Sequence, residues 1–385
     1  MTSLHHLIAD RAQRVDASGI RKVFDLARDM KNPVNFSIGQ PDFPLPPTVL
    51  DALQSALHAG HTAYTPTQGI APLREAITRR LDAEFGWNSL DDRGLLITSG
   101  VSGALMLAIL ATVQAGDEVI FLDPYFVMYR HIVTMAGGTS VCVSAYPDFQ
   151  LPGQAILDAV TARTKMVILN SPANPTGAVY HEPQLRPLVL ELEQRGILVI
   201  SDEIYDLFCY EPFTSCAPYA PNVMLMRGFS KTYAMTGLRL AYAVGPRHII
   251  EEMTKLQQFS FVCAPAPAQH AGIAALNVDM TPFVTAYRAR RDRLLQGLAA
   301  AGYNFTTPGG SFYVFPEVPP QYPSAQEFVR QAIAHELLII PGNVFSARDT
   351  HFRISYACPE PIIDRGLEIL DRLARLSYPS ASTPG

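Results

Sequence analysis

The stretch GFSKTYAMTGLRLAY, residues 228–242, carries two cationic side chains among small residues. Lys231 follows a small-residue turn, and Arg239 comes eight positions later. A lysine that is removed from water beside another positive charge has a lowered pKa, which an imine-forming amine requires. The alternative for Lys231 is a solvated surface position, the usual place of a lysine.

Polar residues also follow two apolar runs that are typical of buried strands. Asp202 and Tyr205 come after ILVIS, and Asn174 begins a proline turn after KMVILN. A carboxylate at the end of a buried strand needs a cation or a protonated nitrogen as its partner, unless it caps a helix. Asn174 can offer its amide to a ligand oxygen or serve only as an Asn-Pro turn.

A small-residue turn follows the apolar run LLIT and opens into a helical pattern. The backbone N–H groups of Gly100, Val101 and Ser102 could hold a phosphate at the positive end of that helix. Alternatively, these residues form only a tight turn with a serine as the helix cap. The text GVSGA is also close to a G-x-S-x-G nucleophile elbow, but Gly103 and Ala104 are out of place for it.

Most of the chain alternates apolar runs with helical patterns, which predicts a mainly parallel sheet covered on both faces. The expected strands of this α/β domain are GLLITSG, DEVIFLD, TSVCVSA, KMVILNSP, ILVISDE, NVMLMRGFS and LAYAVG. A helix is expected over 16–30, followed by a proline-rich arm. After the arginine-rich helix from residue 287, the runs SFYVFPEV, LLIIPGNVF and HFRISYA predict a smaller α/β lobe, closed by a helix over 361–376. The tail from 377 is expected to be disordered.

Composition excludes several classes of function. The 385 residues have a net charge of −5, so no basic excess points to nucleic acid. No apolar run approaches the length of a membrane span, and the first residues are too polar for a signal peptide, so we expect a cytoplasmic protein. The five cysteines are scattered without a C-x-x-C pair, which argues against a disulfide framework or a zinc site.

Together these motifs, in this chain order, resemble the pyridoxal-phosphate-dependent aminotransferases of class I/II and fold type I, the aspartate aminotransferase superfamily. The resemblance runs from about residue 18 to about residue 359, and GFSKTYAMTGLRLA is its most specific part, with SPANPTG, SDEIY and FRISYA as companions. It implies a large domain with a mainly parallel seven-stranded sheet over 47–280. It also implies a small domain over 281–385 that packs with the helix and arm of 1–46.

The resemblance implies a role for each matching residue around pyridoxal 5′-phosphate. Lys231 would form the internal aldimine and then act as the proton-transfer base, while Asp202 would pair with the ring nitrogen. Tyr205 and Asn174 would bond the ring's phenolic oxygen, and Phe126 would stack on the ring unless it is only core packing.

The remaining implied roles concern the phosphate and the substrate. Arg239 and Ser230 would bind the phosphate with the turn at 100–102, and Tyr64 would reach the phosphate of a second subunit in a homodimer. Arg353 would bind the substrate α-carboxylate, unless it is a strand arginine in a salt bridge. Gly39 would donate its N–H to the same carboxylate, and Ile20 would lie near the mouth of the pocket.

The function implied is an aminotransferase that exchanges an amino acid with a 2-oxo acid in a ping-pong cycle. A C–S lyase or a cyclopropane-forming synthase of the same fold is the nearest alternative. A non-catalytic ligand sensor and a serine hydrolase using Ser102 are alternatives of other classes, although His270 and His351 lie in no matching context for the hydrolase. The amino donor and the acceptor are not predicted.

Overall fold

A seven-stranded sheet forms the centre of the computed structural model, which describes residues 4–16, 19, 30, 32–87, 90 and 92–377. The strand order is β2-β8-β7-β6-β5-β3-β4, and only β8 runs antiparallel to its two neighbours. The mainly parallel sheet predicted from the apolar runs is therefore confirmed. The strands are β2 (Arg93–Thr98), β3 (Glu118–Asp123), β4 (Thr139–Ser144), β5 (Thr164–Asn170), β6 (Leu198–Asp202), β7 (Val223–Gly228) and β8 (Ala241–Pro246).

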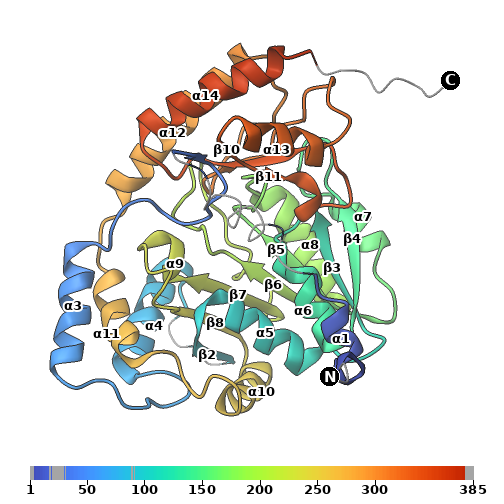
Figure 1. The fold of residues 1–385 in the computed structure, drawn as a ribbon. Helices are drawn as coiled ribbons and strands as arrows, with labels where there is room; N and C mark the ends of the chain where they lie inside the picture. Colours follow the sequence, from blue (N-terminus) through green and yellow to red (C-terminus); the bar gives the residue numbers. More distant parts are fainter. Residues whose placement is uncertain are drawn as a thin grey trace.

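Helices cover both faces of this sheet (Figure 1). Side chains alternate along each strand, so Leu198 and Ile200 of β6 pack on one face while Ile197 and Val199 pack on the other. The first face is covered by α5 (Gly100–Thr112), α6 (Met128–Ala136) and α10 (Arg247–Gln258). The second is covered by α3 (Pro47–His58), α4 (Ala71–Phe85), α7 (Gly153–Asp158), α8 (Glu182–Gln194) and α11 (Ala266–Ala275).

A smaller group of elements lies beside the carboxyl-end edge of the large sheet. Its three-stranded antiparallel sheet has the order β11-β12-β9, from β9 (Tyr313–Val314), β11 (Ile340–Pro341) and β12 (Phe352–Ser355). The arm joins it, because β1 (Val34–Asn35) pairs in parallel with β10 (Leu337–Leu338). The segment that precedes the large sheet in the chain is therefore hydrogen-bonded to the C-terminal elements.

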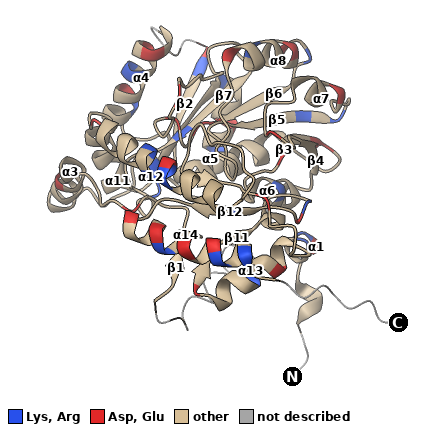
Figure 2. Ribbon diagram, turned by 90° about the horizontal axis from the view of Figure 1, so that it is seen from above, with Lys and Arg blue, Asp and Glu red and all other residues tan. Residues whose placement is uncertain are grey.

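Three amphipathic helices cover the smaller sheet: α12 (Thr281–Ala300), α13 (Ala325–Ala334) and α14 (Glu360–Arg375). In α14 the buried positions Ile363, Gly366, Leu370 and Leu373 follow the helical period, so its charged residues face outward. In the ribbon of Figure 2, the colours of Lys, Arg, Asp and Glu recur along both α14 and α8. No helix within the described ranges is long and apolar enough to cross a membrane.

The remaining described helical segments are short. They are η1 (His5–Leu7), α1 (Asp10–Gln13), α9 (Phe229–Thr232) and η3 (Gly342–Val344). Most of the helix expected over 16–30 and nearly all of the tail fall outside the described residues, so neither expectation is tested. Of these short segments α9 bears on the site, because it directly follows β7 and carries Lys231.

Candidate active site

A cavity of about 310 Å³ opens where the carboxyl ends of the central strands meet the smaller sheet. In open α/β sheets this edge is where ligands bind, because the loops after the strands converge there. It is lined by Gly39, Val101, Ser102, Leu105, Phe126, Asn170, Asn174, Asp202, Ile204, Tyr205, Ser230, Lys231, Thr236, Arg239, Tyr313 and Arg353. Eleven of these sixteen are residues that the sequence singled out.

The sheet register brings the key polar residues side by side. Asn170 at the end of β5 is the partner of Asp202 at the end of β6, and Asp202 is in turn the partner of Met226 in β7. Two residues after Met226 the strand ends, and α9 presents Lys231 to the cavity. The parallel order of these strands therefore places Asp202 and Lys231 at one edge.

Lys231 is half-buried, which excludes the solvated surface position. Its Nζ donates to the carbonyl oxygen of Gly39 at 2.5 Å. Burial lowers the pKa of Lys231 to about 8, with further contributions from the positive charges of Arg353 and Arg239. A substantial neutral fraction near pH 8 makes this amine a nucleophile and a proton acceptor.

Asp202 is buried, with 2% of its surface exposed. Its Oδ2 accepts from the Tyr129 hydroxyl at 2.6 Å, and its Oδ1 accepts from the backbone N–H of Ile204 at 3.3 Å. Burial raises its pKa to about 6 although both hydrogen bonds act in the opposite direction. No helix begins there, so the capping alternative fails. A buried carboxylate without a cationic partner in the described ranges suits a protonated nitrogen.

Arg239 and the start of α5 form a cradle for an anion. Its Nη2 donates to Ser102 Oγ at 2.8 Å. Gly100 has a φ of +75°, and a Cβ there would overlap the Arg239 guanidinium, so glycine is needed for this approach. The serine cap of the alternative reading is absent, because Ser99 at the N-cap makes no side-chain cap bond. Arginine, hydroxyl groups and helix N–H groups together are donors that a phosphate prefers.

The serine-hydrolase alternative finds no support in this geometry. Ser102 accepts its hydrogen bond from Arg239, and no histidine lines the cavity as described. His270 instead stacks on His61 at 4.1 Å, and His351 stacks on Phe315. Among the described residues, none is placed as a histidine general base for Ser102.

Arg353 from β12 reaches the cavity with 1% of its surface exposed. Its Nη1 donates to Asn174 Oδ1 at 3.0 Å and its Nη2 to the Ser37 carbonyl oxygen at 2.9 Å. Its Nε is buried without a partner. The described residues offer Arg353 no salt bridge, contrary to the alternative, and an unpartnered guanidinium N–H is suited to a ligand carboxylate.

Three aromatic side chains complete the walls of the cavity. The hydroxyl of Tyr205 lies 3.1 Å from that of Tyr313, whose ring lies under the Arg353 guanidinium at 4.5 Å. Phe126 faces the cavity from the turn before α6. The smaller sheet thus contributes both Tyr313 and Arg353.

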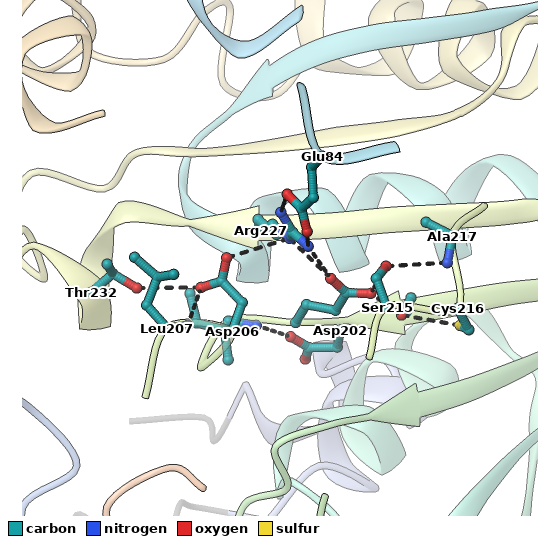
Figure 3. A network of polar contacts seen from close by, with 12 residues as sticks. Glu84, Asp202, Asp206, Leu207, Ser215, Cys216, Ala217, Arg227 and Thr232 are labelled. Atoms are coloured by element: carbon teal, nitrogen blue, oxygen red, sulfur yellow. Dashed lines mark hydrogen bonds and ion pairs between the residues drawn. The ribbon is translucent and has the colours of Figure 1, made fainter. Parts of the chain in front are cut away.

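A buried ionic cluster supports the residues next to the site (Figure 3). Arg227 of β7 contacts Glu84 at 2.6 Å, Glu203 at 2.9 Å and Asp206 at 3.4 Å. Glu203 directly follows Asp202, and Asp206 directly follows Tyr205. Asp206 also accepts from Thr232, the residue after Lys231, at 3.4 Å. The cluster therefore fixes the backbone beside three cavity residues.

Four polar residues of the site were not predicted, namely Asn170, Thr236, Tyr313 and Tyr129. Asn170 could have been found, because it ends the KMVILN strand and polar residues at strand ends were the signal used. Tyr313 and Tyr129 gave no such signal, because a tyrosine in an apolar run reads as core. Their hydroxyl contacts exist only in the folded chain.

One predicted residue that the structure describes, Tyr64, lies away from the cavity. Tyr64 is 84% exposed, between α3 and α4, and does not line it. Ile20 lies outside the described residues, so its expected place at the pocket mouth is not tested. Gly100 lies directly behind the lining, beside Arg239.

One edge of the large sheet brings together a lysine, a buried aspartate and an anion cradle, which is typical of an α/β enzyme that binds a ligand with an anionic group. Comparison with known proteins identifies the family. The family model described as aminotransferase class I and II matches residues 31–370. The chain belongs to this family, and it is a transaminase.

Several relatives are similar over nearly their whole length. The aspartate/prephenate aminotransferase of Thermus thermophilus is 36% identical over 92% of this chain and 94% of its own. Aromatic-amino-acid aminotransferase 2 of Thermococcus litoralis is 30% identical over 96% of this chain and 98% of its own. The solved structure of Thermus thermophilus aspartate aminotransferase with maleate has a TM-score of 0.91 at 34% identity, covering 95% of this chain and 99% of that one.

Proposed function

We propose that this aminotransferase binds pyridoxal 5′-phosphate in the cavity and uses it to move an amino group from an amino acid to a 2-oxo acid. The observation that carries the proposal is the set of polar groups that share this cavity: an amine of lowered pKa on Lys231, the buried carboxylate of Asp202 and the anion cradle of Arg239. When bound, the cofactor supplies an aldehyde carbon for the amino group and a ring that accepts electrons.

The residues present fit that cofactor at both of its ends. Asp202 is a buried acceptor without a cation in the described ranges, and a protonated ring nitrogen would satisfy it. Arg239, Ser102, Ser230 and the N–H groups that open α5 would hold the phosphate. The space that Gly100 leaves beside Arg239 keeps the cradle open to an anion.

The side walls fit the ring between these ends. Phe126 would stack on one ring face. Because Oδ1 of Asn174 accepts from Arg353, its Nδ2 is the group that can donate to the phenolic oxygen, and the Tyr205 hydroxyl would be the second donor.

Lys231 is proposed to anchor the cofactor and then to take the proton from the α-carbon of the substrate. A pKa of about 8 lets Nζ accept a proton near neutral pH and release it again. Arg353 would hold the α-carboxylate through its unpartnered Nε, assisted by the N–H of Gly39. Substrate held at Arg353 would present its α-carbon to Lys231, because both residues line the one cavity.

We also propose a homodimer in which Tyr64 completes the phosphate site of the second subunit. Tyr64 and Phe259 are 84% and 91% exposed, which is unusual for large rings without a partner surface. The Tyr64 segment is nevertheless held firmly, since buried Gln269 donates to Thr65 Oγ1 at 2.9 Å and buried Gln257 to the Thr67 carbonyl at 2.7 Å. A rigid segment that presents an exposed ring fits a contact in trans.

Amino-acid turnover tests the reaction and the donor. The purified protein with pyridoxal 5′-phosphate is incubated with one amino acid and 2-oxoglutarate, and the glutamate formed is measured. Aspartate and phenylalanine belong in the panel, because the names of the relatives include aspartate and aromatic amino acids. Pyruvate with ammonia or sulfide, formed without any need for the oxo acid, would instead indicate an elimination enzyme.

Mixing two inactive variants tests the composite site. Tyr64→Ala chains and Lys231→Ala chains are unfolded together, refolded and assayed. A heterodimer would contain one site with both wild-type residues, so random pairing should restore about a quarter of the wild-type activity. If the mixture stays as inactive as its components, Tyr64 does not act in trans.

A further inference from the structure

Tyr129 touches the candidate ring-nitrogen partner directly. It is the second residue of α6, is 2% exposed, and donates from its hydroxyl to Asp202 Oδ2 at 2.6 Å. Burial, and next the negative charge of Asp202, hold the pKa of this phenol well above its ordinary value. Tyr129 therefore keeps its proton and remains a donor at neutral pH.

The turn that carries Tyr129 also carries Phe126. The backbone N–H of Tyr129 donates to the Phe126 carbonyl oxygen at 3.0 Å, and the two rings meet edge to face at 5.7 Å. One short segment thus places an aromatic ring in the cavity and a hydrogen-bond donor on the carboxylate at its floor.

We propose that Tyr129 is a positioning residue that fixes both the orientation and the charge of Asp202 for the ring nitrogen of the cofactor. The proposal rests on the proposed cofactor site and adds a residue to it. Tyr129 touches neither the cavity nor its contents, because it is absent from the lining as described. It acts through Asp202 alone.

The physical argument has two parts. The carboxylate receives one donor on each oxygen, Tyr129 on Oδ2 and the Ile204 N–H on Oδ1, so its plane is fixed while further lone pairs remain for a ligand. Hydrogen bonds to the charged form also oppose the effect of burial, which disfavours that form. Without Tyr129, Asp202 would be protonated at a higher pH and would accept a weaker bond.

The other ionisable groups around Asp202 do not replace this donor. Tyr205 bonds to Tyr313, and Tyr180 interacts with Tyr129 only at a distance. Lys231, Arg239 and Arg353 share the cavity, but among the described residues none of them forms an ion pair with Asp202. Tyr129 is therefore the side chain on which the ionisation of Asp202 depends most directly.

Binding of pyridoxamine 5′-phosphate to the apoprotein tests the inference. This probe carries the ring nitrogen and the phosphate but forms no bond to Lys231, so its dissociation constant can be measured by fluorescence from pH 6.5 to pH 9. Tyr129→Phe removes only the hydroxyl. We expect it to bind about tenfold more weakly than the wild type at pH 6.5. The loss should be clearly smaller at pH 9, where Asp202 is ionised in both proteins and only its orientation is affected.

Tyr180→Phe is the matched control, because Tyr180 is an equally buried phenol without a bond to Asp202. Its affinity should follow the wild type at every pH. A loss that is the same for Tyr129→Phe at all pH values, or no loss, overturns the inference. In an Asp202→Asn background Tyr129→Phe should cause no further loss, and an undiminished loss there also overturns it. Failure of the wild type itself to bind the probe would overturn the cofactor site as well.

Discussion

Arg353 and Asn174 are joined by a hydrogen bond of 3.0 Å between Nη1 and Oδ1, although 179 residues separate them in the chain. Arg353 belongs to β12 of the smaller sheet, and Asn174 follows β5 of the large one. The bond fixes which edge of the guanidinium is engaged and which amide group of Asn174 remains a donor. The two sheets therefore build one site in common.

Replacing Arg353 by lysine should weaken substrate binding. The planar fork, which holds Asn174 and Ser37 and leaves Nε for a ligand, becomes a single ammonium group. We expect kcat/KM for the amino donor to fall by about 100-fold, mostly through KM. Arg293→Lys is the control, because Arg293 pairs with Asp364 on the exposed surface and should leave the kinetics unchanged. An unaltered KM in Arg353→Lys would contradict the role in carboxylate binding.

Replacing Lys231 by alanine should abolish covalent attachment of the cofactor. Wild-type protein loaded with pyridoxal 5′-phosphate and reduced with borohydride should carry the added pyridoxyl mass on the peptide that contains Lys231. Lys231→Ala should give no such peptide and no near-visible absorbance band. Lys255→Ala serves as the control, because Lys255 is exposed and paired with Glu252. Label on any other lysine would disprove the assignment.

The free energy of unfolding of the apoprotein should depend on pH through the ionisation of Asp202. Burial raises its pKa from 3.8 to about 6, so the native state binds more protons than the unfolded state between these values. Its contribution to stability is therefore present below about pH 4 and is lost as the pH rises through about 6. Asp202→Asn should make the apoprotein more stable than the wild type at pH 7, by on the order of 1–3 kcal/mol, and about equally stable at pH 4.

Urea unfolding of both apoproteins across this pH range measures the effect. Asp364→Asn is a suitable comparison, because Asp364 is exposed and its pKa is lowered by the hydrogen bond from Arg293. That variant should gain no stability at pH 7. Equal stability of wild type and Asp202→Asn at all pH values would show that burial does not disfavour the charged carboxylate.

Replacing Arg227 by methionine should destabilise the protein. The change leaves Glu203 and Asp206 buried without their cation, which we expect to lower the free energy of unfolding by about 3–5 kcal/mol. Glu84→Gln removes the outermost partner, whose side chain is 34% exposed, and should have a much smaller effect. Thermal unfolding compares the two, and equal losses would place the stabilising contact at Glu84 instead.

Much of the site could be predicted because its polar residues come shortly after the apolar runs that form the strands. Asp202, Asn174 and Lys231 each follow an apolar run closely, and parallel strands bring such positions to one edge. Tyr129 could not be predicted in the same way, because its partner Asp202 lies 73 residues away and nothing in the sequence of its helix marks a hydroxyl that donates.

The sequence by itself determined the family, the seven strands of the large sheet and the residue types of the cavity, because periodicity and motif spacing are properties of the chain. Tertiary structure alone decided which partners these residues have. Arg353 meets Asn174 only when β12 docks against the large sheet, and Asp202 receives the Tyr129 hydrogen bond only when α6 packs on a face of that sheet. Hydrogen bonds between distant residues depend on packing distance and direction, which neither composition nor spacing encodes.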